Sequence, residues 1–577
     1  MFNKYYEQEL QNLKQAAVEF AKAHPATAPM LSGPTADPDA ERLLEGVAFL
    51  SGLLHQKLHD DFPEIIHSLM EVTFPHYIRP IPATSIVIFT PKPNLPETIQ
   101  VKRGISLASV PVDGTPCFFQ TCFDIDVHPL RLSAADLSQA SQQLLQIRLS
   151  MELTGPDLSR WNPSRLGFFM GGSHTQATDL FAILNHYLRK IVLRPLSGGA
   201  DCILPPGDIK PIGFDMDKTL LKYPTHSFSG YRLLQELFVL PRKFTFFELT
   251  GWEKWQDRGK GKQFEIIFEL APFPLAPPKV TKDLFILNAT PVINLFKHEA
   301  DPFLFDHRLE KVRIRPVAQN PEHYQVFSID KVIGYEQGTV TKKEYHPLTL
   351  FQETDRRQSV YQVNYARSPI NDAPETFLSF SYPTGGVDPA SETLSVSLTC
   401  TNGALPERLQ LGDISVPTSE SPELLTFRNV LPPTAPIDPP LGENATWRFL
   451  SHLSLNYLSL ANLDNLKELL RLYVLPEARD KAMIAANIKR IEGIQDFRVV
   501  PADRLIRGMI MRGQEIEMTA RQDHFAGFGD LYLFGCVLDL FFGVYSSINT
   551  FISFKLKESL TGETIIWPTR MGDRLLS

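Results

Sequence analysis

The side chains best suited to chemistry in this sequence are serines, histidines and carboxylates that fall close together in two short stretches. One stretch is Gly171-Gly172-Ser173-His174. It resembles the G-x-S-x-G turn of hydrolases only superficially, because the second glycine is missing. A catalytic triad assembles from separate segments, so a serine followed directly by a histidine does not indicate one. The pattern favours a structural role for this stretch.

The second stretch combines histidines and carboxylates that could in principle bind a metal ion: His55, His59, Asp60, Asp61 and His67. His55 and His59 are four residues apart and would share one helix face. The H-E-x-x-H context of a zinc site is absent. The same residues are explained as the solvated side of a helix whose apolar side carries Leu50 and Leu54. Since no nucleotide-binding glycine motif is present either, we expect no catalytic residue, no metal site and no cofactor.

Composition excludes several other classes of protein. The 577 residues exceed what one hydrophobic core supports, so about two to four domains are expected. A net charge of −8 without a basic stripe argues against nucleic-acid binding. The five cysteines are scattered and form no C-x-x-C pair, which predicts reduced thiols in a cytoplasmic protein. The first residues contain no apolar signal segment, in agreement with that location.

One apolar stretch, residues 531–554, has nearly the length of a membrane span. Asp539 lies within it, and Ser546, Ser547 and Asn549 follow. A charge near the middle of a span is costly. We therefore expect a buried helix that leads into a strand, and no direct membrane insertion.

The elements that organise the chain begin with two amphipathic segments at the N-terminus. In the first, apolar residues recur in steps of four and three: Tyr6, Leu10, Leu13, Ala17 and Phe20. The second repeats the pattern with Leu43, Val47, Leu50 and Leu54. Such spacing predicts helices with a narrow seam for another helix. Asp37 is placed to cap the second helix, with Pro38 at its first position. We expect that helix to end before Pro63, with a short third helix after it.

These helices carry more apolar residues than one hairpin buries, because five lie outside the two seams: Phe2, Leu44, Phe49, Leu53 and Leu58. The N-terminal segment is therefore expected to be completed by another protein chain. After residue 76 the pattern changes to that of short strands. The 46 prolines are typical of edge strands and rigid turns. The polar stretch 133–143 is expected to be a connector. Abundant aromatic residues, such as Phe246, Phe247, Trp252 and Trp255, are best explained as core packing.

The expected fold is α+β and multidomain, rich in sandwich-like β domains, with a helical N-terminal segment and a helix-containing C-terminal domain. The expected divisions are 1–76 for the N-terminal helices, 77–200 and 201–429 for two β-rich domains, and 444–577 for a C-terminal α/β domain. Residues 430–443 contain five prolines and are expected to form a stiff linker before that last domain.

Several long phrases of the sequence together resemble the TssF family (also called VasA or ImpG), baseplate components of the bacterial type VI secretion system. They include YYEQELQNLKQAAVEFAKAHP at 5–25, PHYIRPIP at 75–82, GYRLLQELFVLPRKFTFFEL at 230–249, NATPVINLFKHEADP at 288–302 and LTCTNGALPERLQLG at 398–412. FGCVLDLFFGVYSSINTF and WPTRMGDRLL complete the likeness near the C-terminus. The resemblance spans essentially the whole chain in order.

The resemblance implies a structural, phage-like role without catalysis. Two copies of TssF would join one TssG in a baseplate wedge, with TssK attached through TssG and linking the wedge to the inner-membrane complex. The wedge would be surrounded by TssE, the VgrG hub, the Hcp tube and the contractile sheath. The two N-terminal seams would supply this chain's part of a core bundle. Phe541, Phe542 and Tyr545 are secondary interface candidates.

Other classes of function remain open at this stage. Many β-sandwiches with exposed tryptophans and paired carboxylates bind or cleave carbohydrates. The sequence does not place such carboxylates on facing strands, and the missing signal segment argues against an extracellular glycan. A phage-like tail protein associated with DNA would share the same architecture.

Overall fold

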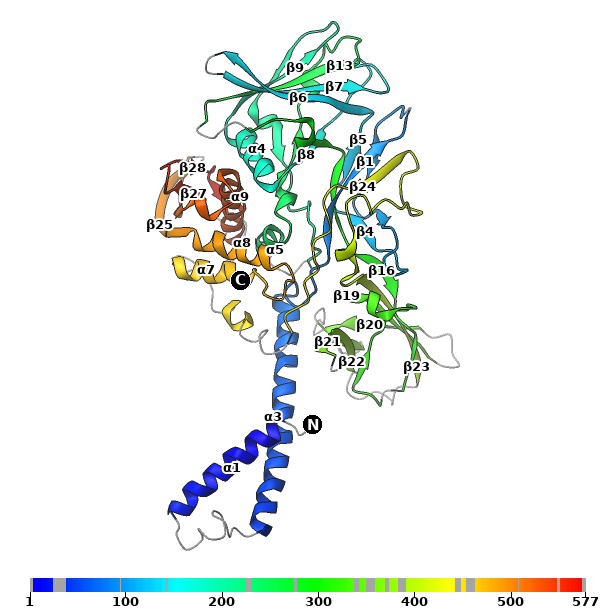
Figure 1. Ribbon diagram of the computed structural model, residues 1–577, viewed down its shortest axis with the longest axis vertical. Coiled ribbons are helices and arrows are strands. Elements are labelled where there is room, and N and C mark those ends of the chain that lie inside the picture. Colours follow the sequence, from blue (N-terminus) through cyan, green and yellow to red (C-terminus); the bar gives the residue numbers. More distant parts are fainter. Residues whose placement is uncertain are drawn as a thin grey trace.

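A computed structural model shows a helical arm that projects from a body of β-sheets (Figure 1). The described residues are 4–23, 38–93, 95–141, 144–223, 230–273, 278–306, 308–336, 342–348, 359–368, 373–381, 391–441, 448–452, 462–506, 508–546 and 550–572. For a few positions inside helices and strands only the backbone is described. The architecture is mixed and rich in strands, with helices at both ends of the sequence, which confirms the expected fold class.

The arm consists of α1 (Lys4–Ala23) and α3 (Pro38–Thr73). Both predicted helices are confirmed, and Pro38 occupies the first helical position. The predicted end before Pro63 is wrong, because α3 runs through that proline to Thr73. A proline inside a helix removes one hydrogen bond and costs about 3 kcal/mol. Beyond it, Ile66 and Met70 are buried in the body, and this burial offsets the cost.

The first sheet of the body joins distant parts of the sequence. Its strands have the order β24-β1-β15-β4-β3, with bounds Leu425–Asn429, Thr84–Pro91, Ala289–Ile293, Phe118–Thr121 and Ser106–Ala108. A small ladder is formed by β2 (Ile99–Val101) and β5 (Ile125–Val127). The Pro-rich segment after β24 lies along the residues before β1. The Thr434 N–H donates to the Thr84 carbonyl at 2.8 Å, and Ile437 pairs with Ile81. The described residues of the expected linker, up to Leu441, therefore pack on the body.

Two further sheets lie next to each other in the upper half of the body (Figure 1). One has the order β10-β9-β13-β7-β6, with bounds Cys202–Leu204, Leu188–Pro195, Gln263–Leu270, Leu144–Leu153 and Leu130–Ser141. The other has the order β11-β12-β8-β14, with bounds Ile209–Pro211, Phe246–Leu249, Leu166–Met170 and Phe285–Leu287. The connector expected at 133–143 is wrong, because β6 extends to Ser141 as an edge strand. Ser133, Asp136 and Gln139 are exposed, while Ala135, Leu137 and Ser138 are half-buried.

The expected division at 200/201 separates strands that hydrogen-bond to one another. β13 lies between β7 and β9, and β10 pairs with β9. β24 likewise pairs with β1 across most of the chain. The expected segments therefore share sheets, and their division into independently folding domains stays a prediction.

A larger sheet on the opposite side of the body has the order β16-β23-β19-β20-β21-β22-β18, with β17 also on β23. The bounds are Phe296–Glu299, Glu392–Thr401, Gln325–Glu336, Lys342–Pro347, Val360–Arg367, Pro374–Ser381 and Lys311–Arg313, and Phe303–Phe305 for β17. Its core is separate from that of the other sheets and includes Val332, Leu394 and Leu398. α3 contacts β21, so the base of the arm rests against this sheet.

The C-terminal region forms its own sheet, in the order β25-β26-β27-β28 with β29 on β27. The bounds are Ile494–Ile506, Met509–Ala520, Phe551–Glu558, Thr564–Ile566 and Arg570–Met571. The apolar stretch forms α9 (Phe528–Tyr545) followed by β27, which confirms the expected buried helix and strand. Among the residues described, no helix is both long and apolar enough to span a bilayer.

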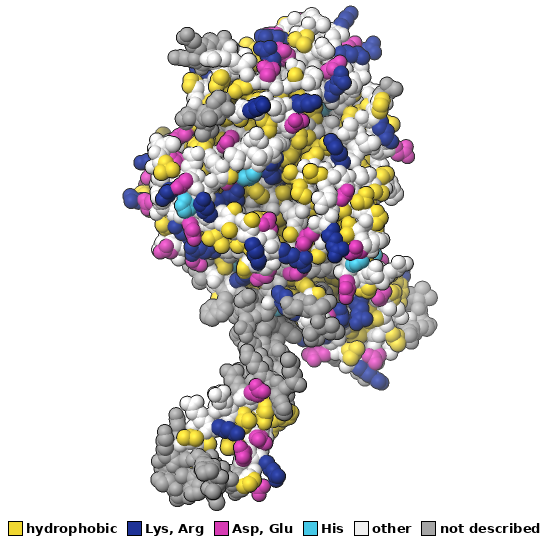
Figure 2. All heavy atoms as spheres, viewed as in Figure 1, with side chains coloured by type: hydrophobic (Ala, Val, Ile, Leu, Met, Phe, Trp, Pro, Cys, Tyr) yellow, Lys and Arg dark blue, Asp and Glu magenta, His cyan; other side chains and the backbone are white. Residues whose placement is uncertain are grey.

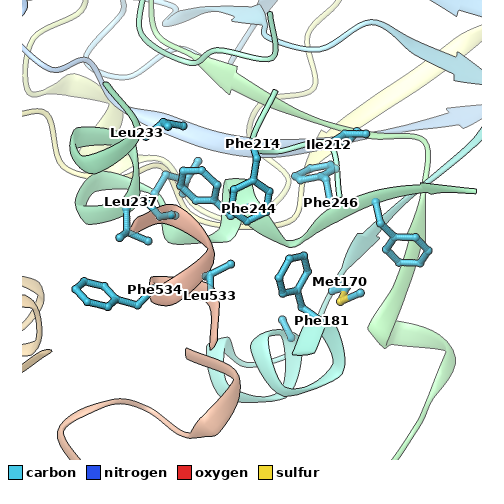
Figure 3. Close-up of a cluster of buried hydrophobic side chains, with 14 of the residues drawn as sticks. Met170, Phe181, Ile212, Phe214, Leu233, Leu237, Phe244, Phe246, Leu533 and Phe534 are labelled. Carbon is cyan, nitrogen blue, oxygen red and sulfur yellow. The ribbon is translucent and has the colours of Figure 1, made fainter. Parts of the chain in front are cut away.

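The remaining described helices help to complete the core. They are α4 (His174–His186), α5 (Gly230–Val239), α7 (Leu463–Leu472) and α8 (Lys481–Glu492). Short 3-10 turns occur at 206–208, 241–245, 252–254, 282–284, 321–323, 405–408 and 522–524. α9 packs against α4 and α5. Figure 3 shows Leu533 and Phe534 of α9 near Leu237 of α5 and Phe181 of α4. One continuous core therefore joins the C-terminal region to the body.

Candidate interface sites

The two helices of the arm pack against each other in an antiparallel arrangement. The rings of Tyr6 and Phe49 meet edge to face with centroids 6.4 Å apart. Nearer the other end of α1, Lys14 Nζ lies 3.1 Å from Glu41 Oε1. Ala48 is fully buried in this part of the arm, and its small side chain allows close approach of the helix backbones.

The two predicted seams differ in how far their residues are buried in the arm. On α1, Tyr6, Leu10 and Leu13 are half-buried, Ala17 is buried, and Phe20 is 51% exposed. On residues 38–52 of α3 the half-buried and buried positions are Leu44, Ala48, Ser51 and Gly52, which sequence reasoning did not assign to a seam. The i, i+4 spacing of small residues was the signal that could have identified them.

The predicted seam of α3 is therefore left on the surface. Leu43, Val47 and Leu50 are 71%, 41% and 62% exposed. The side chain of Leu54 lies outside the described residues. Figure 2 shows hydrophobic side chains on the surface of the projecting arm. We call Leu43, Val47 and Leu50 the arm stripe; it is apolar, follows helical spacing and is not covered by α1.

Where α3 enters the body, aromatic side chains from four segments of the sequence pack against one another around the end of the helix. We call this group the collar: Phe74, His76, Tyr77, Tyr223, Tyr231, His452 and Tyr473. His76 stacks on Tyr223 with centroids 4.6 Å apart, and Phe74 stacks on His452 at 4.8 Å. His76 Nε2 and the Tyr473 hydroxyl share a hydrogen bond of 3.2 Å. These contacts fix the base of the arm to the body.

The histidines of the collar are held in their neutral form. Burial, together with the nearby His452 and Arg79, lowers the pKa of His76 well below its ordinary value. Burial and the charge of Arg448 lower the pKa of His452 to about 3. Neither ring nitrogen of His452 has a hydrogen-bond partner among the described residues. An ion pair between Arg79 and Glu71, 3.2 Å apart, ties the last turns of α3 to the chain that follows.

The phrase 230–249 forms α5 and the turn and strand after it, at the centre of the body. Glu236 is fully buried, pairs with Lys243, and accepts the Leu220 N–H at 2.8 Å. Arg242 donates to the carbonyls of Met170 and Gly172 at 2.7 and 2.8 Å. Burial lowers the pKa of Arg242 to about 10. Glu236 and Lys243 pair with each other, and Arg242 donates to backbone carbonyls, so these contacts link α5 to the loops and strand around it.

The Ser173-His174 stretch has a structural role. The Ser173 side chain accepts the Gln176 N–H and caps α4. His174 Nε2 lies 2.9 Å from Asp530 Oδ1, and Arg490 Nε lies 2.9 Å from the other oxygen of Asp530. Burial alone would raise the pKa of Asp530, but the hydrogen bond with His174 and the charge of Arg490 outweigh it and lower that pKa to about 2. The cluster connects α4, α8 and α9.

Two of the three secondary interface candidates on α9, Phe541 and Phe542, are part of the chain's own core. Phe541 and Phe542 are 0% and 4% exposed. Their rings contact Tyr231 at 6.0 Å and Phe497 at 5.7 Å between centroids. The side chain of Tyr545 lies outside the described residues. Apolar residues occupy most positions around α9, so the sequence did not distinguish its buried side from a docking face.

The described residues do not support the hypotheses of a metal site or of a carbohydrate site. His67 is buried, and the side chains of His55, His59, Asp60 and Asp61 lie outside the described residues. No group of three or more His, Cys, Asp or Glu side chains within the described part of the chain is arranged to hold a metal ion. The tryptophans described are buried rather than displayed as platforms: Trp161, Trp252, Trp255 and Trp567.

A body of linked sheets with a projecting, partly uncovered helical arm is the architecture of an assembly component. The comparisons agree with this class. The family model "Type VI secretion system, TssF" matches residues 1–574, and the chain belongs to that family.

Individual relatives match over nearly the full length. "Type VI secretion system component TssF1" of Pseudomonas aeruginosa is 28% identical, covering 99% of this chain and 98% of the relative. A cryo-electron microscopy structure of a TssK-TssF-TssG baseplate subcomplex contains a chain that is 28% identical with a TM-score of 0.79, covering 93% of this chain and 100% of that one. A chain in a structure described as the baseplate complex from the type VI secretion system is 26% identical with a TM-score of 0.60, covering 99% and 100%.

Proposed function

We propose that this chain is a structural subunit of the type VI secretion baseplate, without catalytic activity of its own. Its family membership over residues 1–574 supports this, as do the two similar chains found in solved baseplate assemblies. We further propose that two copies join one TssG in a wedge, with TssK held through TssG. In this arrangement TssE, VgrG, Hcp and the sheath surround the wedge, and the protein is a cytoplasmic component recruited to the inner-membrane complex.

The observation that carries this proposal is the arm stripe. Three large apolar side chains at helical spacing stay exposed on α3 although α1 packs beside them. Burying them against another helix would contribute about 1.5–3 kcal/mol each, before the cost of association. The collar holds the base of α3, so a bundle formed on the arm would also orient the body. The arm is therefore this chain's contribution to a bundle with TssG and a second copy.

The test is co-expression with TssG from the same organism. Leu43→Asp combined with Leu50→Asp puts two charges on the stripe, and desolvating them opposes bundle formation. Losing two buried leucines should weaken association by about 100-fold or more. We expect TssG to be lost from affinity-purified protein, while circular dichroism and yield of the chain itself stay near those of the wild type.

The matched control is Leu43→Met with Leu50→Met, which keeps an apolar surface of similar volume. This variant should retain TssG. Normal recovery of TssG with the double Asp variant would contradict the role of the arm stripe.

A further inference from the structure

The arm stripe has the spacing of one side of a two-stranded coiled coil. Its three exposed residues are separated by four and then three positions, which places Leu43 and Leu50 at d positions and Val47 at an a position of the heptad. A β-branched residue at a, with leucine at d, favours a pair of parallel helices over larger parallel assemblies. The residue types of the stripe therefore favour one facing helix that runs parallel to α3.

A glycine beside the stripe completes a site for one side chain of that facing helix. In a coiled coil, each such side chain enters a hole between four residues spaced i, i+3, i+4 and i+7. We call the four residues with this spacing the stripe hole: Leu43, Gly46, Val47 and Leu50. A methyl group added at Gly46 would meet nothing within 4 Å, so no contact within the chain requires a glycine there, although glycine weakens a helix. Close approach of a second helix explains the missing side chain.

The residues that flank the stripe indicate that the facing helix is α3 of a second copy. In parallel coiled coils the e and g positions of the two helices face each other. Opposite charges there select an unlike helix, and like charges oppose the pairing of identical helices. Around the stripe these positions are Leu44, Gly46 and Ser51, none of which is charged, while Glu45 lies at f, away from the contact. Asp39, at the preceding g position, would face Leu44 of the second copy, so self-pairing brings no like charges together.

We propose that the arm stripes of two copies pair in parallel and in register, so that Val47 of each copy enters the stripe hole of the other. This inference rests on the proposed function and deepens it, because it names the helix that covers the stripe. Three side chains from each copy form a small contact compared with the total of about 1,200 Å² or more that stable complexes bury. The pair therefore forms within the complex with TssG, for which Phe49, 54% exposed outside the stripe, remains available.

The first test is disulfide formation between copies in the complex co-expressed with TssG. Leu43→Cys and, separately, Leu50→Cys place a thiol at a d position, and in a parallel pair in register each d position faces its own counterpart. After oxidation, each variant alone should give a dimer on a non-reducing gel. The matched control is Glu45→Cys, exposed on the same helix but outside the stripe, which should give none. The wild type, whose own cysteines are buried or half-buried, should give none either.

The second test exchanges charges at the centre of the stripe, in chains that also carry Leu43→Cys. Val47→Glu in both copies brings two carboxylates together, and Val47→Lys in both copies brings two ammonium groups together. Each change should lower the yield of the crosslink by about ten-fold or more, because like charges would be desolvated side by side. Co-expression of one chain with Val47→Glu and a differently tagged chain with Val47→Lys should restore the crosslink between them, since opposite charges then meet.

Three results would overturn the pairing of the stripes. They are the absence of a crosslink at both d positions, a crosslink only when the Leu43→Cys and Leu50→Cys chains are mixed, as an antiparallel pair requires, and no restoration by the mixed charges. Recovery of TssG is measured in the same samples. If TssG is present and the copies do not crosslink, the inference about the stripe fails and the proposed function stands. If the wild-type chain does not recover TssG, the proposed function fails, whatever the crosslinks show.

Discussion

Single residues in this chain show how burial sets the state of titratable groups. His76 and His452 are enclosed by aromatic rings, and Glu236, Lys243 and Asp530 are buried with charged partners. The two classes respond differently to pH. Asp530 keeps its charge because His174 and Arg490 stabilise it, whereas the collar histidines lose theirs because burial opposes protonation.

The neutral state of His452 predicts acid sensitivity of the arm's attachment. Its pKa is about 3 in the folded chain and near 6.5 in the unfolded chain. Below pH 6.5 the unfolded state binds a proton that the folded state does not. Stability is therefore lost as the pH falls from 6.5 towards 3, and at pH 5 the loss from this residue is about 2 kcal/mol.

The measurement is the difference in melting temperature between pH 7 and pH 5, on the purified complex. His452→Phe keeps a ring that stacks on Phe74 and removes no hydrogen bond among the described residues. We expect this variant to show a smaller difference than the wild type. His346→Phe, at an exposed position on β20, serves as the control and should leave the difference unchanged. An unchanged difference in the His452 variant would rule out this source of acid sensitivity.

At the scale of elements, the arm depends on a small residue at the contact between its helices. Ala48 has no exposed surface, so Ala48→Leu would overpack the contact and cost about 1–3 kcal/mol. We expect faster proteolysis of residues 4–23, with the body still resistant. Gly46→Ala is the control: nothing lies within 4 Å of the added methyl group, and replacing a helical glycine by alanine stabilises by about 0.5–1 kcal/mol. Equal proteolysis of wild type and Ala48→Leu would show that this contact is not tight.

The same elements show which features the sequence could predict. The 3.6-residue pattern identified α1 and the first part of α3, and the charge of Asp539 correctly placed residues 531–554 inside the protein. Local rules failed where tertiary packing decides. Pro63 does not end α3, because Ile66 and Met70 are buried beyond it, and the polar stretch after Leu132 becomes an edge strand on β7. The spacing of the large apolar residues also indicated the wrong side of α3, because the small residues Ala48 and Gly52, four positions apart, are the buried ones.

At the scale of the whole molecule, one core connects the collar, the central sheets and the C-terminal region. The described part of the Pro-rich segment, residues 430–441, is packed along residues 81–86, and its role as a linker between domains stays a prediction. A load applied to the arm would therefore pass into the body through buried contacts rather than through a free linker. This continuity suits a structural subunit that must keep its partners at fixed relative positions.

The stoichiometry of the wedge is the prediction that belongs to this scale. Two arms, each with an exposed stripe, would bundle with one TssG, because each stripe needs a further apolar helix to cover it. Light scattering of the co-expressed complex should give a mass equal to two chains of 65.2 kDa plus one TssG. The Leu43→Asp, Leu50→Asp variant should give no complex of that mass, whereas Leu43→Met, Leu50→Met should. A stable complex with one copy of each protein would contradict the shared bundle, and a lone chain that ignores TssG would contradict the role of the arm altogether.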